Sequence, residues 1–287
     1  MFTLIEEVSN MPSTEPFVRW AGGKTWLIPY LPQIIGDAHI EHYHEPFLGG
    51  GAVFFSLDHA KRSYLSDANE QLIDTYVQIR DNPQGVITCL QQFVNSEDEY
   101  YRIRDNFEPT TPAEAAARFI YLNQTSYNGL FRVNRQGKYN VPYGFRKRWH
   151  YDVERITAAS EKLKNTRITA GDFEINKHRI KEHDLVFLDP PYTVSHNNNG
   201  FIEYNKSLFS LEDQKRLSRF IDYIKSKNAY YILTNAAHEE IQRIFSKNGD
   251  RLLELQRNSL IGGKNASRAE ISEYIFTNLP GGIANNE

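Results

Sequence analysis

The tetrapeptide Asp189-Pro190-Pro191-Tyr192 follows directly after the apolar run 185–188. In an open α/β sheet, ligands bind outside the carboxyl ends of the strands, so we expect Asp189 at the edge of a binding site. The two prolines lack backbone N–H donors and hold the turn extended. A carboxylate, an accepting carbonyl and an aromatic face can then converge on one planar group. A nucleobase that carries an exocyclic amine is such a group.

A glycine-rich turn precedes this motif in the chain. Residues 45–55, E-P-F-L-G-G-G-A-V-F-F, predict the end of a strand, a glycine turn and the start of an apolar helix. Glycines at such a place let a ligand approach the backbone closely. A second acid, Asp67, ends a short strand about twenty residues further on, where a carboxylate suits the two hydroxyls of a ribose.

A third motif, W-A-G-G-K-T, occupies residues 20–25. The segment Gly23-Lys24-Thr25 is similar to the end of a phosphate-binding loop. That loop also requires a glycine at position 18, where this chain has Val18, so we reject the assignment. What remains is an indole, two glycines and a lysine at a helix entrance. A plain loop with a helix cap is the alternative.

The stretch 115–151 contains no Asp or Glu, although the whole chain carries a net charge of −3. Its basic residues are Arg118, Arg132, Arg135, Lys138, Arg146, Lys147 and Arg148. Its aromatic residues include Tyr127, Phe131, Tyr139, Tyr143, Phe145, Trp149 and Tyr151. Basic groups neutralise phosphates, and aromatic rings stack on bases or wedge between them. The stretch therefore predicts a nucleic-acid surface with tight turns and a hairpin, and a solvated loop is the alternative.

Composition excludes several classes of protein. The chain has 287 residues, of which 40% are hydrophobic, and its single cysteine permits no internal disulfide. Methylation at a ring carbon of cytosine needs a nucleophilic thiolate, whereas Cys89 lies in an apolar helical stretch and is expected in the core. We find no membrane-spanning run and no signal-peptide pattern, so we expect a cytoplasmic protein.

The apolar periodicity predicts alternating strands and helices. One strand is expected to end at 45, and further strands are expected at 64–67, 167–173, 185–188, 230–235, 251–255 and 271–278. A helix is expected to begin near 26, the region 71–107 is expected to be helical, and further helices are expected at 112–122, 211–226 and 238–247. This alternation predicts an α/β fold with a mainly parallel, doubly wound sheet. We expect 1–72 and 158–287 to form the sheet domain and 73–157 to be a helical and hairpin insert.

The ordered motifs together resemble the Dam-like family of DNA adenine methyltransferases. The similarity extends from residue 20 to residue 278 and includes Y-N-G-L-F-R-V-N at 127–134 and N-V-P-Y-G at 140–144. It implies a Rossmann-like fold with S-adenosylmethionine as methyl donor. It also implies methyl transfer to the N6 amine of adenine in double-stranded DNA, with the insert as the target-recognition domain.

The resemblance also assigns site residues by position. The expected cofactor contacts are Trp20, Gly23, Lys24, Glu45, Phe47, Gly49, Gly51, Asp67, Asp172, Phe173 and Asp189. The expected catalytic residues are Asp189, Pro190 and Tyr192. The expected DNA contacts are Arg19, Tyr127, Asn128, Arg132, Asn134, Pro142, Arg146 and Arg148.

The expected mechanism follows from the chemistry of the adenine amine, whose lone pair is delocalised into the ring. Asp189 and the carbonyl of Pro190 can accept its two hydrogens and free the lone pair, while Tyr192 stacks on the base. The methyl then transfers in line, with no metal and no covalent enzyme intermediate. A base inside a duplex cannot reach the methyl donor, so it must be flipped out.

The expected target sequence is GATC, with one reservation. Several family members that read GATC carry a basic residue directly after the glycine of N-V-P-x-G, whereas Phe145 follows Gly144 here and Arg146 comes next. Arg132 can still read a guanine through a bidentate contact. The reading of the outer base pair is therefore open.

Two other functions stay open from the sequence. One is an RNA or cytosine-N4 amino-methyltransferase, because the D-P-P-Y motif favours adenine only as a tendency. The other is a catalytically inactive DNA-binding regulator, against which the intact Asp189, Lys24 and Asp67 argue. We expect a monomer that acts on the DNA of the nucleoid. Whether a cognate restriction endonuclease is a further partner is open.

Overall fold

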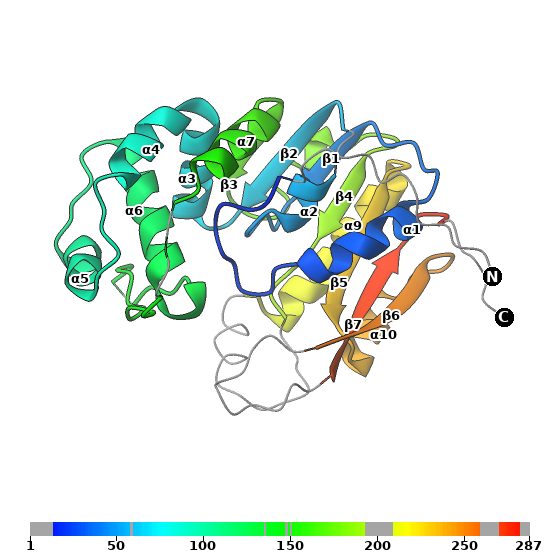
Figure 1. The fold of residues 1–287 in the computed structure, drawn as a ribbon. Coiled ribbons are helices and arrows are strands. Elements are labelled where there is room, and N and C mark those ends of the chain that lie inside the picture. The colour runs from blue at the N-terminus through cyan, green and yellow to red at the C-terminus, as the bar shows by residue number, and fades with distance from the viewer. Residues whose placement is uncertain are drawn as a thin grey trace, which may run out of the picture.

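A seven-stranded sheet forms the centre of the computed structural model, which describes residues 14–57, 60–134, 136–146, 149, 151–192, 209–258 and 270–281. The strand order is β3-β2-β1-β4-β5-β7-β6 (Figure 1). The strands are β1 (His42–Glu45), β2 (Arg62–Asp67), β3 (Thr166–Ala170), β4 (Leu185–Leu188), β5 (Tyr230–Ala236), β6 (Arg251–Asn258) and β7 (Glu270–Thr277). Strands β1 to β5 pair in parallel, and β7 runs antiparallel to β5 and β6. The predicted mainly parallel, doubly wound sheet is confirmed.

Helices cover both faces of the sheet. Side chains of a strand alternate between faces, so Leu185 and Phe187 of β4 join one core and Val186 and Leu188 join the other. The first face is packed by η1 (Thr25–Tyr30), α1 (Leu31–Ile35), α2 (Ala52–Ser56), α3 (Glu70–Asp81) and α7 (Val153–Leu163). The second face is packed by α9 (Leu211–Ser226) and α10 (Glu239–Phe245). A further short turn, η3 (Lys177–Arg179), follows β3.

The segment between β2 and β3 is mainly helical. It adds α4 (Pro83–Leu90), α5 (Glu97–Asp105), α6 (Pro112–Thr125) and η2 (Tyr127–Gly129), which extend beyond the β3 side of the sheet in Figure 1. The predicted helical region 71–107 is divided, because Pro83 cannot continue α3 and Asn82 caps α4 by accepting from the backbone N–H of Gly85. Among the helices described here, none is long and apolar enough to cross a membrane.

The predicted domain boundaries fall inside helices. The boundary at 72/73 lies in α3 and the boundary at 157/158 lies in α7. Helix α3 packs against β3 on one side and against α6 on the other, so it belongs to the cores of both parts. The division into two domains stays a prediction.

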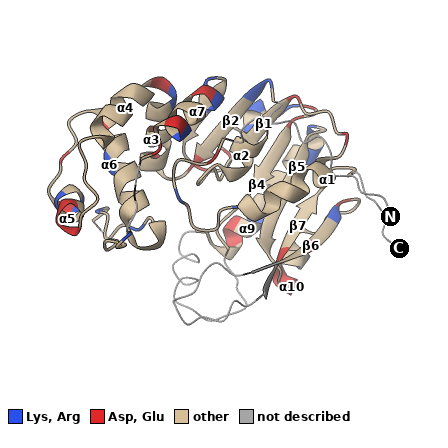
Figure 2. Cartoon of the chain, in the orientation of Figure 1, with Lys and Arg blue, Asp and Glu red and all other residues tan. Residues whose placement is uncertain are grey.

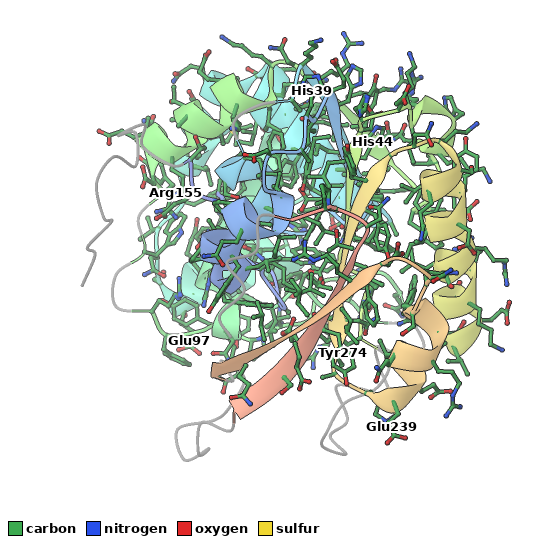
Figure 3. The ribbon with its side chains drawn as sticks, turned by 90° about the vertical axis from the view of Figure 1, so that its right-hand side faces the viewer. His39, His44, Glu97, Arg155, Glu239 and Tyr274 are labelled. Atoms are coloured by element: carbon green, nitrogen blue, oxygen red, sulfur yellow. The ribbon has the colours of Figure 1, made fainter. Side chains whose placement is uncertain are left out.

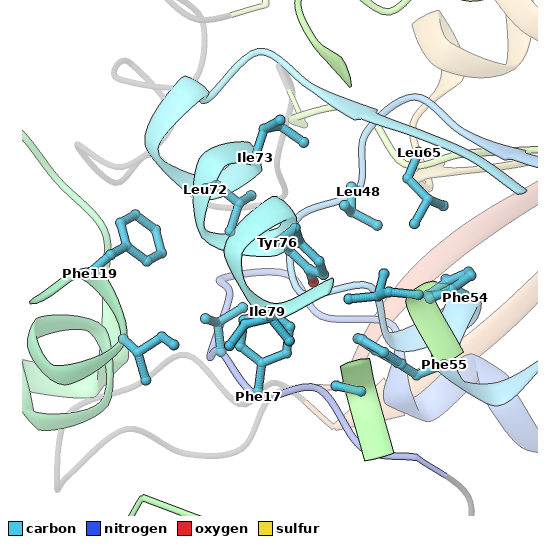
Figure 4. Close-up of a cluster of buried hydrophobic side chains, with 14 of the residues drawn as sticks. Phe17, Leu48, Phe54, Phe55, Leu65, Leu72, Ile73, Tyr76, Ile79 and Phe119 are labelled. Atoms are coloured by element: carbon cyan, nitrogen blue, oxygen red, sulfur yellow. The ribbon is translucent and has the colours of Figure 1, made fainter. Parts of the chain in front are cut away.

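Helix α3 also anchors the glycine-rich turn. Figure 4 shows Tyr76 of α3 beside the aromatic rings of Phe17 and Phe55, with Leu72 and Ile73 of the same helix in the same buried cluster. The Tyr76 ring is fully buried, and its hydroxyl donates to the carbonyl of Gly49 at 3.2 Å. Burial of each such side chain stabilises the fold by roughly 1.5–3 kcal/mol. The turn is therefore anchored to a buried part of the core.

The topological switch point lies between β1 and β4. These two strands pair in parallel, with Tyr43 opposite Leu185 and His44 opposite Val186. The chain leaves β1 toward β2 on one side and leaves β4 toward β5 on the other. Ligands of open α/β sheets bind in the crevice that such a divergence creates at the carboxyl ends of the strands.

Candidate active site

Asp189 stands directly after β4 at this switch point. Its Oδ1 accepts from Lys24 Nζ at 2.8 Å and from Thr234 Oγ1 of β5 at 2.8 Å. The Lys24 side chain is 4% exposed and the Asp189 side chain is 20% exposed. Within the described part of the chain, no hydrogen bond to Oδ2 is found. One carboxylate oxygen is therefore fixed by the protein, and the other is left for a ligand.

The charge state of Asp189 reflects two opposing effects. Burial raises the pKa of its carboxyl above the ordinary value, and the Lys24 ammonium acts in the opposite direction. Lys24 also donates to the carbonyl of Gly22 at 2.7 Å, so the ammonium itself is held in place. The ion pair favours the ionised carboxylate, which is the form that accepts hydrogen bonds.

The ring of Tyr192 is held at its face and at its hydroxyl. Lys24 Nζ lies 5.0 Å from the ring centroid, and the hydroxyl donates to Glu273 Oε2 of β7 at 2.6 Å. Burial raises the pKa of Tyr192 well above its ordinary value, with the charges of Asp189 and Glu273 adding to the effect. The phenol therefore stays protonated and remains a donor.

Sequence analysis missed Thr234 and Glu273. The available signal was weak, because Thr234 merely follows an apolar run in β5 and Glu273 is one of several polar residues in β7. Both are buried, at 0% and 1% exposed. A buried polar side chain needs a hydrogen-bond partner, and here the partners belong to the D-P-P-Y motif.

Glu45, predicted as a cofactor contact, ends β1 with its carboxyl group buried. Its Oε2 accepts from the hydroxyl of Tyr43 at 2.8 Å. Burial raises the pKa of Glu45 to about 8, and the negative charge of Asp189 adds to the increase. At neutral pH this carboxyl group is therefore largely protonated.

The glycine-rich turn fits only glycine at two positions. Gly49 has φ +47°, and a Cβ there would lie 2.6 Å from Trp20 Cδ1. Gly51 has φ +67°, and a Cβ there would lie 2.9 Å from the Tyr76 hydroxyl. A side chain at either place would be strained and would also clash. The turn thus leaves backbone, rather than side chains, facing the crevice.

Asp67 holds this turn in place from the end of β2. Its Oδ2 accepts from the backbone N–H of Gly49 at 2.9 Å, and its Oδ1 accepts from that of Asn69 at 3.0 Å. Burial raises the pKa of Asp67, while these backbone donors act against the increase. Each carboxylate oxygen has two lone pairs, so both can still accept from a ligand hydroxyl.

The remaining predicted cofactor contacts lie beside the crevice. Phe47 and Phe173 stack with ring centroids 5.5 Å apart at 27°. Asp172 is half-exposed, and its Oδ2 accepts from Arg216 Nη2 at 2.6 Å while its Oδ1 accepts from the backbone of Glu174. A ligand that uses Asp172 must therefore share it with Arg216.

The predicted cofactor contact Gly23 is exposed and closes the 20–25 turn by donating its backbone N–H to the Trp20 carbonyl at 3.2 Å.

The expected DNA-binding segment contacts the crevice through Trp20 and Arg19. Trp20 stacks on Phe131, with ring centroids 5.7 Å apart at 23°. The fully buried amide of Asn123 in α6 accepts from Arg19 N and donates to Arg19 O, both at 2.8 Å. Burial lowers the pKa of Arg19, and the charge of Arg146 lowers it further. Arg19 therefore lies close to Arg146, which belongs to the acid-free stretch.

The predicted hairpin is reduced to two antiparallel bridges, Ser126 with Tyr143 and Val133 with Tyr139. The rest of 126–144 folds as tight turns. Asn134 shapes one of them, because its Oδ1 accepts from the backbone N–H groups of residues 136 and 138. Figure 2 shows Lys and Arg on the loops that follow α6, where the sequence has no acid.

Several predicted DNA contacts are exposed in these turns. Arg132 is exposed, and its Nε donates to Asn140 Oδ1 at 2.8 Å, which braces the guanidinium. Tyr127 is 50% exposed and donates its backbone N–H to Pro142, which is itself exposed. Phe145 is 68% exposed and has φ +49°. Asn128, with φ +56°, shapes the turn at η2, whereas Arg148 lies outside the described residues.

Comparison with known proteins gives one consistent result. The family described as D12 class N6 adenine-specific DNA methyltransferase matches residues 20–259. The chain is 34% identical to the Type II methyltransferase M1.LlaDCHI of Lactococcus lactis subsp. cremoris, over 94% of this chain and 97% of the relative. It is 35% identical to the Type II methyltransferase M.MjaIII of Methanocaldococcus jannaschii, over 77% of this chain and 84% of the relative. It is 25% identical to the DNA adenine methylase of Escherichia coli K12, over 96% of this chain and 99% of the relative.

Proposed function

The chain belongs to the D12 class of N6 adenine-specific DNA methyltransferases, and from that membership we propose how its site binds the methyl donor and the target base. The crevice at the β1–β4 switch point takes S-adenosylmethionine and a flipped adenine side by side. The acid-free segment 115–151 takes the duplex. The target is GATC, and Arg132 reads a guanine in it.

The residues at the crevice fit S-adenosylmethionine. When bound, this molecule supplies an electrophilic methyl group on a positively charged sulfonium. Asp67 accepts from the ribose hydroxyls, and the backbone of the Gly49 turn lies against the cofactor. Phe47 and Phe173 provide an apolar wall for its adenine ring. Asp172 accepts from that ring's amine in competition with Arg216.

The remaining predicted contacts complete this cofactor site. Gly23 and Gly51 shape the backbone at its two sides, and Glu45 contributes a buried, protonated carboxyl group beneath it. Trp20 covers the glycine turn. The buried Lys24 ammonium lies between the cofactor and the target base, because it already contacts both Asp189 and Tyr192.

Methyl transfer is assigned to the D-P-P-Y motif. Asp189 Oδ2 and the carbonyl of Pro190 accept the two hydrogens of the adenine amine, which frees its lone pair for attack on the methyl group. Bound S-adenosylmethionine would supply the methyl group, and Asp189 would accept the proton that the methylated amine releases. The carboxylate is 20% exposed and passes that proton to water.

Base flipping supplies the adenine to this site. The Asp189 carboxylate lies in a crevice that a stacked base cannot enter, and extruding a base costs a few kcal/mol. We assign the compensating contacts to the exposed Tyr127 and Pro142 beside the flipped position. Phosphate and groove contacts come from Arg19, Asn128, Asn134, Arg146 and Arg148. A partner endonuclease and the oligomeric state stay predictions.

The observation that carries this proposal is the geometry of Asp189, whose Oδ1 is fixed by Lys24 and Thr234 while Oδ2 is left for the amine. The test measures methyl incorporation into duplexes with labelled cofactor and maps methylated adenines in DNA from expressing cells. Asp189→Ala and Asp189→Asn should lower turnover by at least about 100-fold. Duplex affinity should largely survive.

A matched control is Asp222→Ala, which removes an exposed carboxylate paired with Lys247 on the surface. It should leave turnover unchanged. Near-normal turnover by a folded Asp189→Ala protein would remove Asp189 from the mechanism. Methylation of RNA or of cytosine in place of adenine would overturn the proposed substrate.

A further inference from the structure

Glu273 is a buried acid that the proposed mechanism does not use. It belongs to β7, is 1% exposed and lies opposite Ala236 of β5 and Leu255 of β6. Burying a carboxylate is costly unless it is hydrogen-bonded. A hydrophobic residue would pack at this place without that cost. The presence of Glu273 therefore calls for a role in the site.

The antiparallel direction of β7 brings this acid to the active-site edge. Strands β1 to β5 end at that edge, whereas β7 begins there, so an early residue of β7 lies beside the last residues of β5. Figure 3 views the molecule from the β6–β7 side and labels Tyr274, the neighbour of Glu273 on β7. Side chains alternate along a strand, so Glu273 shares the face of Ile275, which packs in the same core as Phe187 and Leu27.

The contact between Glu273 and Tyr192 is short and involves a charged acceptor. The hydroxyl donates to Oε2 at 2.6 Å, within the range typical of O–H···O⁻ bonds. The Lys24 ammonium lies over the ring at 5.0 Å from the centroid. The hydroxyl and one face of Tyr192 are thus both held.

We propose that Glu273 is a positioning residue that fixes the ring plane of Tyr192, so that the ring stacks on the flipped adenine. This inference rests on the proposed function. In this role Glu273 contacts neither the base nor the methyl donor and acts on the base through the Tyr192 hydroxyl. Without it, the ring can rotate about its side-chain bonds, and the adenine amine is less often aligned with Asp189.

The test compares single-turnover methylation of a duplex by the wild type, Glu273→Ala, Tyr192→Phe and the double variant. Glu273→Ala should slow the step by roughly 10-fold or more, the scale of a lost hydrogen bond to a charged group. In the Tyr192→Phe background, the same change should cost less than about twofold, because the hydroxyl is already absent. Glu273→Gln keeps an acceptor oxygen and should restore most of the rate.

A second measurement separates positioning from general structural damage. A duplex with 2-aminopurine at the target position reports base flipping by its fluorescence, and Glu273→Ala should change that signal while cofactor affinity measured by calorimetry stays constant. Glu254→Ala, which removes an exposed acid from the adjacent strand β6, is the matched control and should change neither.

Each other outcome contradicts a specific statement. A normal rate for Glu273→Ala, or an equal loss in both backgrounds, would overturn the positioning role while leaving the proposed function intact. No methyl transfer to adenine by the wild type would overturn both. If Glu273→Ala does not fold, Glu273→Gln with and without Tyr192→Phe is compared instead, and an equal loss in both backgrounds would again overturn the role.

Discussion

At the residue scale, the site gathers carboxyl groups around a single ammonium. Lys24 pairs with Asp189, and Glu273 contacts the same tyrosine that Lys24 covers. Burial raises the pKa of the Asp189 carboxyl, against which the Lys24 ammonium acts, and burial raises the pKa of Glu45 to about 8. Such perturbed groups at a strand-end crevice are typical of a catalytic site.

Asp67 provides the first prediction at this scale. Asp67→Ala should weaken S-adenosylmethionine binding by roughly 1–3 kcal/mol, because ribose hydroxyls and the backbone N–H groups of Gly49 and Asn69 lose their acceptor. Calorimetric titration of the folded protein measures this. Asp67→Asn keeps one acceptor oxygen and should lose less. Unchanged affinity in both variants would place Asp67 outside the cofactor site.

Glu45 predicts a dependence of stability on pH. Its pKa is about 8 in the folded protein against an ordinary value of 4.5, so the folded state binds the proton more tightly. The resulting stabilisation is complete below 4.5 and is lost as the pH rises toward about 8. Within that window the loss is up to about 1.4 kcal/mol per pH unit.

The measurement compares denaturant unfolding of the wild type and Glu45→Gln across that window. The variant has no carboxyl group to ionise at position 45. Its free energy of unfolding should therefore rise relative to that of the wild type as the pH rises. Above about 8 the difference should become constant. Two parallel curves would show that Glu45 ionises normally in the folded protein.

At the scale of elements, the sequence predicted most strands and helices because their apolar periods are local. The expected helix 211–226 matches α9, and the expected strand 230–235 matches β5 within one residue. The region 71–107 is mainly helical as expected, but it is divided into several helices, the first of which ends at Asn82-Pro83. The expected hairpin is present only as two isolated bridges, because residues around Asn134 form a tight turn where paired strands were expected.

The candidate site was predictable only in part, for a related reason. Asp189, Asp67 and the glycines stand at strand ends, which the local pattern marks. Thr234 and Glu273 belong to the site because of hydrogen bonds to Asp189 and Tyr192, which lie 45 and 81 residues away in the chain. Such contacts depend on sheet order and on the antiparallel direction of β7, which no local period encodes.

The glycine turn provides a prediction at this scale. Gly49→Ala should lower cofactor affinity and destabilise the fold, because its Cβ would displace the Trp20 indole in addition to straining the backbone. Gly249→Ala is the matched control, since its φ is +81° with no atom within 4 Å of the new Cβ. It should cost only the left-handed backbone penalty, about 1–2 kcal/mol. Equal effects of the two variants on unfolding and on calorimetric affinity would contradict the close approach of Trp20.

At the scale of the whole molecule, an acidic protein must bind a polyanion through a local surface. The net charge is −3, yet 115–151 carries no acid. We propose that the favourable contacts with DNA are concentrated on this segment. Such a surface would orient the duplex before any base is read.

Two cations of that surface should behave differently. Arg132 is braced by Asn140 and stands in the recognition motif, so Arg132→Ala should reduce discrimination against a mismatched base pair by about 1–3 kcal/mol. The exposed Lys138 should contact only phosphate, so Lys138→Ala should weaken all duplexes alike and lower the salt slope by about one unit. Arg146, the described residue of the basic run 146–148, can be tested in the same way.

The measurement is binding of cognate and single-mismatch duplexes across a salt series. The phosphate contact is recognised by its salt slope and the base contact by its mismatch penalty. If Arg132→Ala keeps full discrimination and merely loses salt dependence, Arg132 is a phosphate contact and the specificity residue lies elsewhere.

The pairing of β1 with β4 also determines when, during synthesis of the chain, the central strand β1 gains its second neighbour. His42 on β1 bonds Asp184 beside β4 across 142 positions, so the central strand has only one neighbour until the second half of the protein exists. At about 5–20 residues per second, a ribosome needs roughly 7–30 seconds to make that interval. During this time the buried side chains of β1 can be covered only by β2 and by the helices made before residue 185. The nascent chain is therefore most exposed to aggregation before residue 185 has emerged, and slower translation of 73–157 would lengthen that period.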